Sequence, residues 1–180
     1  STIDYSGHVG LGLASSIVPD ETGKTWFVTL KDGLKWSDGE PITLEDVVYT
    51  VELMQNNTVS TSYSANFTGI DVEQDGEKLI FTLPAAYADF AATLNIPILP
   101  SHILAQVPAN KLLEHSFSTN PITSGPFRFN AAQNVATSGD KIIYLTANPD
   151  YYKTTPMLNT FAVRTYNQAA DLVDALSMGE

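Results

Sequence analysis

The stretch Leu30–Met54, LKDGLKWSDGEPITLEDVVYTVELM, constrains the fold most, because it joins a strand to a helix with a well-marked start. Thr43 suits the N-cap position, and Asp46 falls at N3, where an acidic side chain can bond back to the cap. Apolar residues then recur with the spacing of one buried helical face. The pattern predicts a helix over Leu44–Met54 that follows the polar turn Ser37–Pro41 and buries one apolar face.

Alternating apolar residues predict strands on both sides of this helix. Before it, Trp26 and Val28 would share one face of a strand. After it, two alternating runs flank Asp75–Gly76, a dipeptide favoured in tight hairpin turns. Further strands are expected in GPFRFNAAQ, DKIIYLTAN and MLNTFAVRTY, with the polar NVATSG joining the first two. This order predicts an α/β (mixed α+β) chain with mixed or antiparallel sheets and flanking helices.

The last segment, NQAADLVDALSMGE, predicts a helix. Asn167 is the expected cap, Leu172, Val173 and Leu176 the expected buried face, and Gly179 the expected stop. In a mixed α/β pattern, a strand followed by a helix usually leads into another strand. We therefore expect this sequence to be part of a longer chain.

The charge balance and the absence of cysteine exclude several classes of function. The 180 residues include 20 acidic and 9 basic side chains, giving a net charge of -11. Such a surface repels phosphate backbones and anionic lipid, so we expect no nucleic-acid partner. Without cysteine there is no disulfide, thiolate metal site or cysteine nucleophile. No apolar run reaches the roughly 18 to 20 residues that a membrane span needs.

Four carboxylates around the helix start invite comparison with a catalytic pair. These are Asp38, Glu40, Glu45 and Asp46. Turn formation and interaction with the positive end of the helix dipole account for all four. The chain also contains no Gly-x-Ser-x-Gly, no phosphate-binding glycine loop and no His-Glu-x-x-His. We therefore expect no enzymatic activity and no cofactor.

The three histidines give no metal-binding pattern. His8, His102 and His115 are far apart in the sequence, and none has a partner at i+3 or i+4. A metal site normally needs several ligands that converge on one point. We interpret the histidines as surface or capping residues and expect no metal.

Four motifs, in order, resemble the bacterial extracellular solute-binding proteins of family 5, the peptide, dipeptide and nickel receptors of ABC importers. The first is FVTLKDGLKWSDGEPITLEDVVYTVE, followed by ILPSHIL and TSGPFRF. The last is LTANPDYYKTTPMLNTFAVRTY with ALSMGE after it. The resemblance runs from about Gly23 onward and is looser over residues 1–22.

The resemblance implies a type II periplasmic-binding-protein-like fold and a two-lobe receptor. Residues 1–119 would form an accessory subdomain of the first lobe, and residues 120–180 the start of that lobe's core. The second, ligand-closing lobe would be absent from this sequence. The receptor would be a monomer in the periplasm or outside the cell, free or lipid-anchored. It would capture a small solute, an oligopeptide by preference, and deliver it to an ABC permease. Nickel chelates and sugar oligomers are the alternative ligands within the family.

The same resemblance points to ligand-contact candidates in the polar, aromatic segment Ser60–Gly69. Because an aromatic residue from this region can reach the ligand cleft in peptide-binding relatives, Tyr63 and Phe67 are the candidates. The alternative is that both rings cover the end of the preceding helix as core residues. The strand lead-in Ser124–Phe127 is expected near the face between the lobes.

Two readings from other classes stay open at this point. A small hydrolase using scattered carboxylates predicts turnover and a convergent pair of acids. A surface interaction module predicts a large exposed apolar patch and a protein partner.

Overall fold

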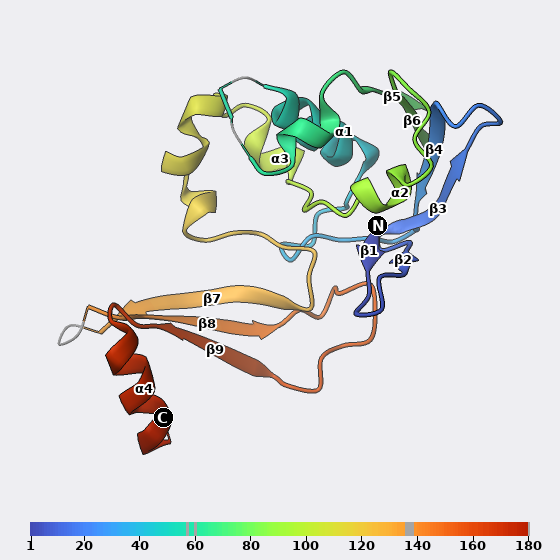
Figure 1. The fold of residues 1–180 in the computed structure, drawn as a ribbon. Helices are drawn as coiled ribbons and strands as arrows, with labels where there is room; N and C mark the ends of the chain where they lie inside the picture. Colours follow the sequence, from blue (N-terminus) through green and yellow to red (C-terminus); the bar gives the residue numbers. More distant parts are fainter. Residues whose placement is uncertain (57, 60, 136–138, 180) are drawn as a thin grey trace.

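The computed structural model describes residues 1–56, 58–59, 61–135 and 139–179 and divides into two parts (Figure 1). Ser60, which opens the candidate segment, and the middle of the predicted NVATSG linker lie outside these residues.

The first part ends near Asn120. Its elements are β1 (Thr2–Ile3), β2 (Val9–Gly10), β3 (Ala14–Pro19), β4 (Thr25–Leu30), α1 (Leu44–Gln55), the 3-10 turn η1 (Ser64–Phe67), β5 (Asp71–Asp75), β6 (Lys78–Thr82), α2 (Phe90–Thr93), α3 (Ser101–Leu104), and the 3-10 turns η2 (Ala109–Glu114) and η3 (Ser116–Ser118).

The second part is a three-stranded sheet with one helix at its end (Figure 1). It contains β7 (Phe127–Asn134), β8 (Lys141–Ala147), β9 (Thr160–Thr165) and α4 (Ala169–Met178). The three strands run in the order β7-β8-β9. Every strand pair within the described residues is antiparallel, which agrees with the predicted fold class.

A four-stranded sheet in the order β3-β4-β6-β5 forms the base of the first part. The predicted hairpin is present as β5 and β6, but its turn lies one residue later than expected. Asp75 pairs with Lys78, so Gly76 and Glu77 form the turn. Gly76 has a φ of 58°, which a glycine adopts without steric cost and most residues avoid.

Helix α1 confirms the prediction made from its start. The backbone N–H of Thr43 donates to Oδ2 of Asp46 at 2.9 Å, which is the reciprocal bond of a capping box. Its buried apolar residues are Val47, Val51 and Met54, as the spacing predicted. The helix ends at Gln55, one residue beyond the predicted end.

The core of the first part consists of two separate clusters. The larger lies between α1, the sheet and α2, where Phe90 packs at 5.7 Å from the Trp26 ring and 5.4 Å from the Phe81 ring. The smaller cluster lies under the polar turn and consists of Leu34, Trp36 and Ile42, with partly buried apolar neighbours. The polar turn therefore rests on a small core of its own.

Two hydrogen bonds join the polar turn to the segment that crosses between the two parts. The N–H of Ser37 donates to the carbonyl of Thr123 at 2.9 Å. In return, the N–H of Thr123 donates to Oγ of Ser37 at 3.1 Å. The crossing segment 120–126 is thus held against the first part (Figure 1).

Helix α4 forms where it was predicted, but two details of the prediction are wrong. Gln168, not Asn167, occupies the N-cap position, and Asn167 instead donates its backbone N–H to Oδ1 of Asp140 at 3.2 Å. Gly179 is the left-handed stop that was expected, with a φ of 77°. The expected buried face is exposed, because no described element covers it: Leu172 52%, Val173 63% and Leu176 76%.

Within the described part of the chain, no helix has both the length and the apolar character required to cross a membrane.

Candidate functional site

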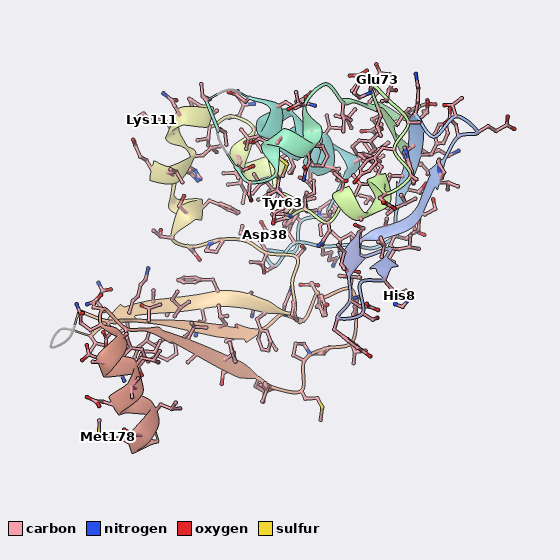
Figure 2. The ribbon with its side chains drawn as sticks, viewed as in Figure 1. His8, Asp38, Tyr63, Glu73, Lys111 and Met178 are labelled. Atoms are coloured by element: carbon pink, nitrogen blue, oxygen red, sulfur yellow. The ribbon has the colours of Figure 1, made fainter. Side chains whose placement is uncertain are left out.

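A cavity of about 360 Å³ opens at the junction of the two parts, and six separate segments of the sequence line it. The first part contributes residues between Ser1 and Pro97 to the lining, and the second contributes Ser124–Pro126 and Tyr151–Tyr152. Figure 2 shows Tyr63 on the side of the first part that faces the second sheet. The lining includes Gly12, Tyr63, Ser124, Gly125, Tyr151 and Tyr152.

The two ligand-contact candidates have different environments. Tyr63 is half-buried, packs against the larger core cluster and lines the cavity. Phe67 lies inside that cluster and is 0% exposed. The amide of Gln55, at the end of α1, donates to the carbonyls of Phe67 at 2.9 Å and Ile70 at 2.6 Å and so fixes η1 against the helix. The geometry favours Tyr63, and contact of either ring with a ligand stays a prediction.

The predicted strand lead-in Ser124–Phe127 comes to the same cavity as Tyr63. Its residues Ser124, Gly125 and Pro126 line the cavity wall opposite the first part. The structure therefore brings together two segments that the sequence indicated separately.

Asn148 holds two walls of the cavity in place. Its side chain is fully buried and donates from Nδ2 to the carbonyl of Gly125 at 2.9 Å. Its own N–H donates to the carbonyl of Pro126, and its Oδ1 accepts the N–H of Asp150 at 3.1 Å. Sequence reasoning took Asn-Pro-Asp as a turn and missed this role, because the partner segment lies 23 residues earlier.

Two tyrosines of the lining, Tyr151 and Tyr152, lie next to two lysines that are not themselves part of the lining. The rings of Tyr151 and Tyr152 meet edge to face, with their centroids 5.1 Å apart. The ammonium of Lys31 lies 5.0 Å from the centroid of the Tyr152 ring, and that of Lys153 lies 5.4 Å from it. Lys31 also donates to the carbonyl of Gly12, a lining residue. Two ammonium groups therefore lie beside the aromatic part of the lining.

The carboxylate of Asp46 is buried, 2% exposed, and is engaged by four donors. Besides the cap N–H of Thr43, they are the indole N–H of Trp36 at 3.1 Å and the N–H and hydroxyl of Ser101, both at 2.7 Å. The expected structural role is confirmed, and the sequence missed that Asp46 also ties α3 to the polar turn. A carboxylate with its oxygens so occupied has no free position for a substrate proton.

The histidines have separate partners. Nδ1 of His115 accepts the N–H of Phe117 and caps η3, as a capping interpretation predicts. His8 is exposed and contacts Ser6. His102 is not isolated as expected, because its Nε2 lies 2.9 Å from Oδ2 of Asp38 in the polar turn. Among the described residues, no three of His, Asp and Glu converge as metal ligands would.

Comparison with known proteins places this geometry in a family. Residues 8–180 match the bacterial extracellular solute-binding proteins, family 5 Middle. A protein of Brucella ovis named as an ABC transporter peptide-binding protein is 35% identical over 150 residues, covering 81% of this chain and 28% of its own length. The oligopeptide-binding protein AppA of Bacillus subtilis is 32% identical over 182 residues, covering 98% of this chain and 33% of its own.

Solved structures agree with the sequence matches. AppA in complex with a nonapeptide superimposes with a TM-score of 0.82 over 98% of this chain and 35% of that protein. NikZ of Campylobacter jejuni in complex with Ni(L-His) gives a TM-score of 0.79 at 25% identity, over 93% of this chain and 33% of that protein. These neighbours are type II periplasmic binding proteins, which confirms the predicted fold class. The chain spans about a third of the length of the relatives that it matches.

Proposed function

The chain belongs to the bacterial extracellular solute-binding proteins of family 5, and we propose from this membership that it is the first-lobe part of a receptor for an ABC importer. The ligand that we propose is an oligopeptide, captured outside the cytoplasmic membrane and delivered to a permease. In this proposal the receptor is a monomer and not an enzyme, free in the periplasm or medium or held by a lipid anchor.

One observation carries the proposal: Tyr63, the strand lead-in at Ser124–Pro126 and the pair Tyr151–Tyr152 converge on one cavity. Concave sites that combine aromatic rings with a few polar backbone groups are typical of small-molecule and peptide binding. The cavity is open, and a receptor that encloses its ligand needs a second face that closes on the first. We therefore propose that a second lobe, outside residues 1–180, supplies that face.

The division of the chain follows the same proposal. Residues 1–119 hold the four-stranded sheet and both core clusters, as an accessory subdomain of the first lobe would. Residues 120–180 begin with the crossing segment and contain the second sheet, as the start of the lobe's core would.

Nickel chelates and sugar oligomers stay the alternative ligands within the family. NikZ was solved in complex with Ni(L-His), so a receptor of this fold can hold a chelate. A peptide is preferred here because the relatives from Brucella and Bacillus are named for peptide binding and match at higher identity.

Native mass spectrometry of the full-length protein, beside residues 1–180 alone, tests this proposal. We expect a co-purified peptide on the full-length protein only, and its mass gives its length. A ligand retained or converted by residues 1–180 alone would contradict the two-lobe proposal. The hydrolase hypothesis, which uses carboxylates such as Asp38 and Glu40, would then be favoured. A nickel-containing or sugar mass on the full-length protein would select one of the alternatives.

A further inference from the structure

The bases of this acidic chain gather beside the candidate cavity. The chain has only 9 basic residues against 20 acidic ones. Three of the bases lie at this corner: Lys31 and Lys153 over the Tyr152 ring, and Lys35 at 3.9 Å from Asp150. Since the charge of Lys35 faces that of Asp150, Lys31 and Lys153 supply the excess positive charge.

The described lining of the cavity contains no acidic residue to offset that charge. Its residues are small, apolar, amide, hydroxyl or tyrosine side chains. Asp150, the acid next to Tyr151 in the sequence, faces Lys35 instead. The lining side chains carry no charge, so no acid within the lining offsets the two ammonium groups beside the Tyr152 ring.

We propose that this cavity receives a carboxylate of the peptide ligand and disfavours a lysine or arginine side chain. The inference rests on the proposed function, because it concerns the selectivity of the same site. It names the charge of the group that the first lobe prefers, whether that carboxylate belongs to a side chain or to the peptide C-terminus.

The position of the lysines explains the direction of the preference. The π-face of a tyrosine attracts cations, so an aromatic cavity alone would favour a basic ligand group. Here two ammonium groups already lie within 5.4 Å of the Tyr152 centroid, and a third cation would meet like charge. Lys31 is half-buried and held by the carbonyl of Gly12, so its charge has a fixed position next to the lining.

Titration calorimetry of the full-length protein with alanine pentapeptides tests the inference. Each peptide carries one Glu, Gln or Lys at a defined position, and each is made with a free or an amidated C-terminus. At one position we expect the Glu peptide to bind about tenfold more tightly than the Lys peptide, because two partly exposed charge pairs contribute up to about fivefold each. A preference that follows the free C-terminus instead would assign the carboxylate to the chain end.

Substitutions of the lysines connect the preference to this cavity. Lys31→Met and Lys153→Met should each reduce the Glu-to-Lys ratio about threefold, with a smaller change in affinity for the Gln peptide than for the Glu peptide. Lys153→Met leaves the bond between Lys31 and Gly12 intact, so it remains informative if Lys31→Met fails to fold. Lys78→Met, at the start of β6, is the matched control and should leave the ratio unchanged.

Two outcomes separate this inference from the proposed function. If peptides bind but the ratio is the same in the wild type and in all three variants, the inference is overturned and the function stands. If no peptide binds at any charge, both are overturned.

Discussion

Asp46 joins three parts of the chain through one buried carboxylate. It caps its own helix through Thr43, receives the indole N–H of Trp36 from the polar turn, and receives both donors of Ser101 from α3. Three elements that are separate in the sequence are therefore fixed by one buried carboxylate.

Asp46→Ala should destabilise the full-length protein by about 3 kcal/mol, because several buried donors lose their acceptor. Glu45→Ala, at the neighbouring exposed position in the same helical turn, is the control and should cost about 0.5 kcal/mol or less. Denaturant unfolding measures both. Equal effects of the two substitutions would show that the buried network contributes nothing beyond the helix dipole.

The two aromatic candidates should differ in what their removal changes. Phe67→Ala opens a hole in the main core and should cost about 3 to 5 kcal/mol of stability. Tyr63→Ala removes a ring at the cavity and should weaken peptide binding about tenfold, with a smaller loss of stability. Unfolding and calorimetry on the full-length protein separate the two effects. A binding loss for Phe67→Ala at retained stability would reverse the assignment.

Among the elements, α4 presents a surface that the described chain leaves uncovered. Phe161 and Val163 of β9 are also exposed, so β9 and α4 both present apolar side chains. If the two-lobe receptor proposed above is correct, a segment outside residues 1–180 is expected to cover this surface. This occupant also accounts for the exposed apolar residues that an interaction module would predict.

Leu176→Ser tests this occupant. In the full-length protein the substitution should cost about 2 to 3 kcal/mol, because the side chain would then be buried. Leu113→Ser, at a leucine of η2 that is 91% exposed, is the control and should change the stability by about 0.5 kcal/mol or less. Similar small effects at both positions in the full-length protein would mean that α4 remains uncovered.

The elements that could be predicted from sequence are those whose signals are local. The start of α1, the β5–β6 hairpin and the stop at Gly179 depend on residues within a few positions of one another. The failures involve distant partners. The N–H of Asn167 is bound by Asp140, 27 residues earlier, and Ser101 reaches Asp46 across 55 residues. Neither hydrophobic periodicity nor turn preference predicts contacts between residues so far apart in the sequence.

At the scale of the whole molecule, the candidate site forms only when segments distant in the sequence come together in the fold. The sequence indicated Tyr63 and the strand lead-in at Ser124 by resemblance, and the structure places both on one cavity. It did not indicate Lys31 or Asn148, which act through a carbonyl or a ring in another segment. The role of Lys31 depends on how the end of β4 meets Gly12 and the loop after β8. The role of Asn148 depends on how that loop meets the strand lead-in at Gly125 and Pro126.

The crossing segment is fixed from both sides, by Ser37 at Thr123 and by Asn148 at Gly125 and Pro126. A wall that is already immobile loses little conformational entropy when a ligand arrives. The conformational entropy lost on binding then comes mainly from the ligand and from the part of the protein that closes over it. The rate of ligand release would accordingly be set by reopening of that other part, while this wall stays preorganised throughout the cycle.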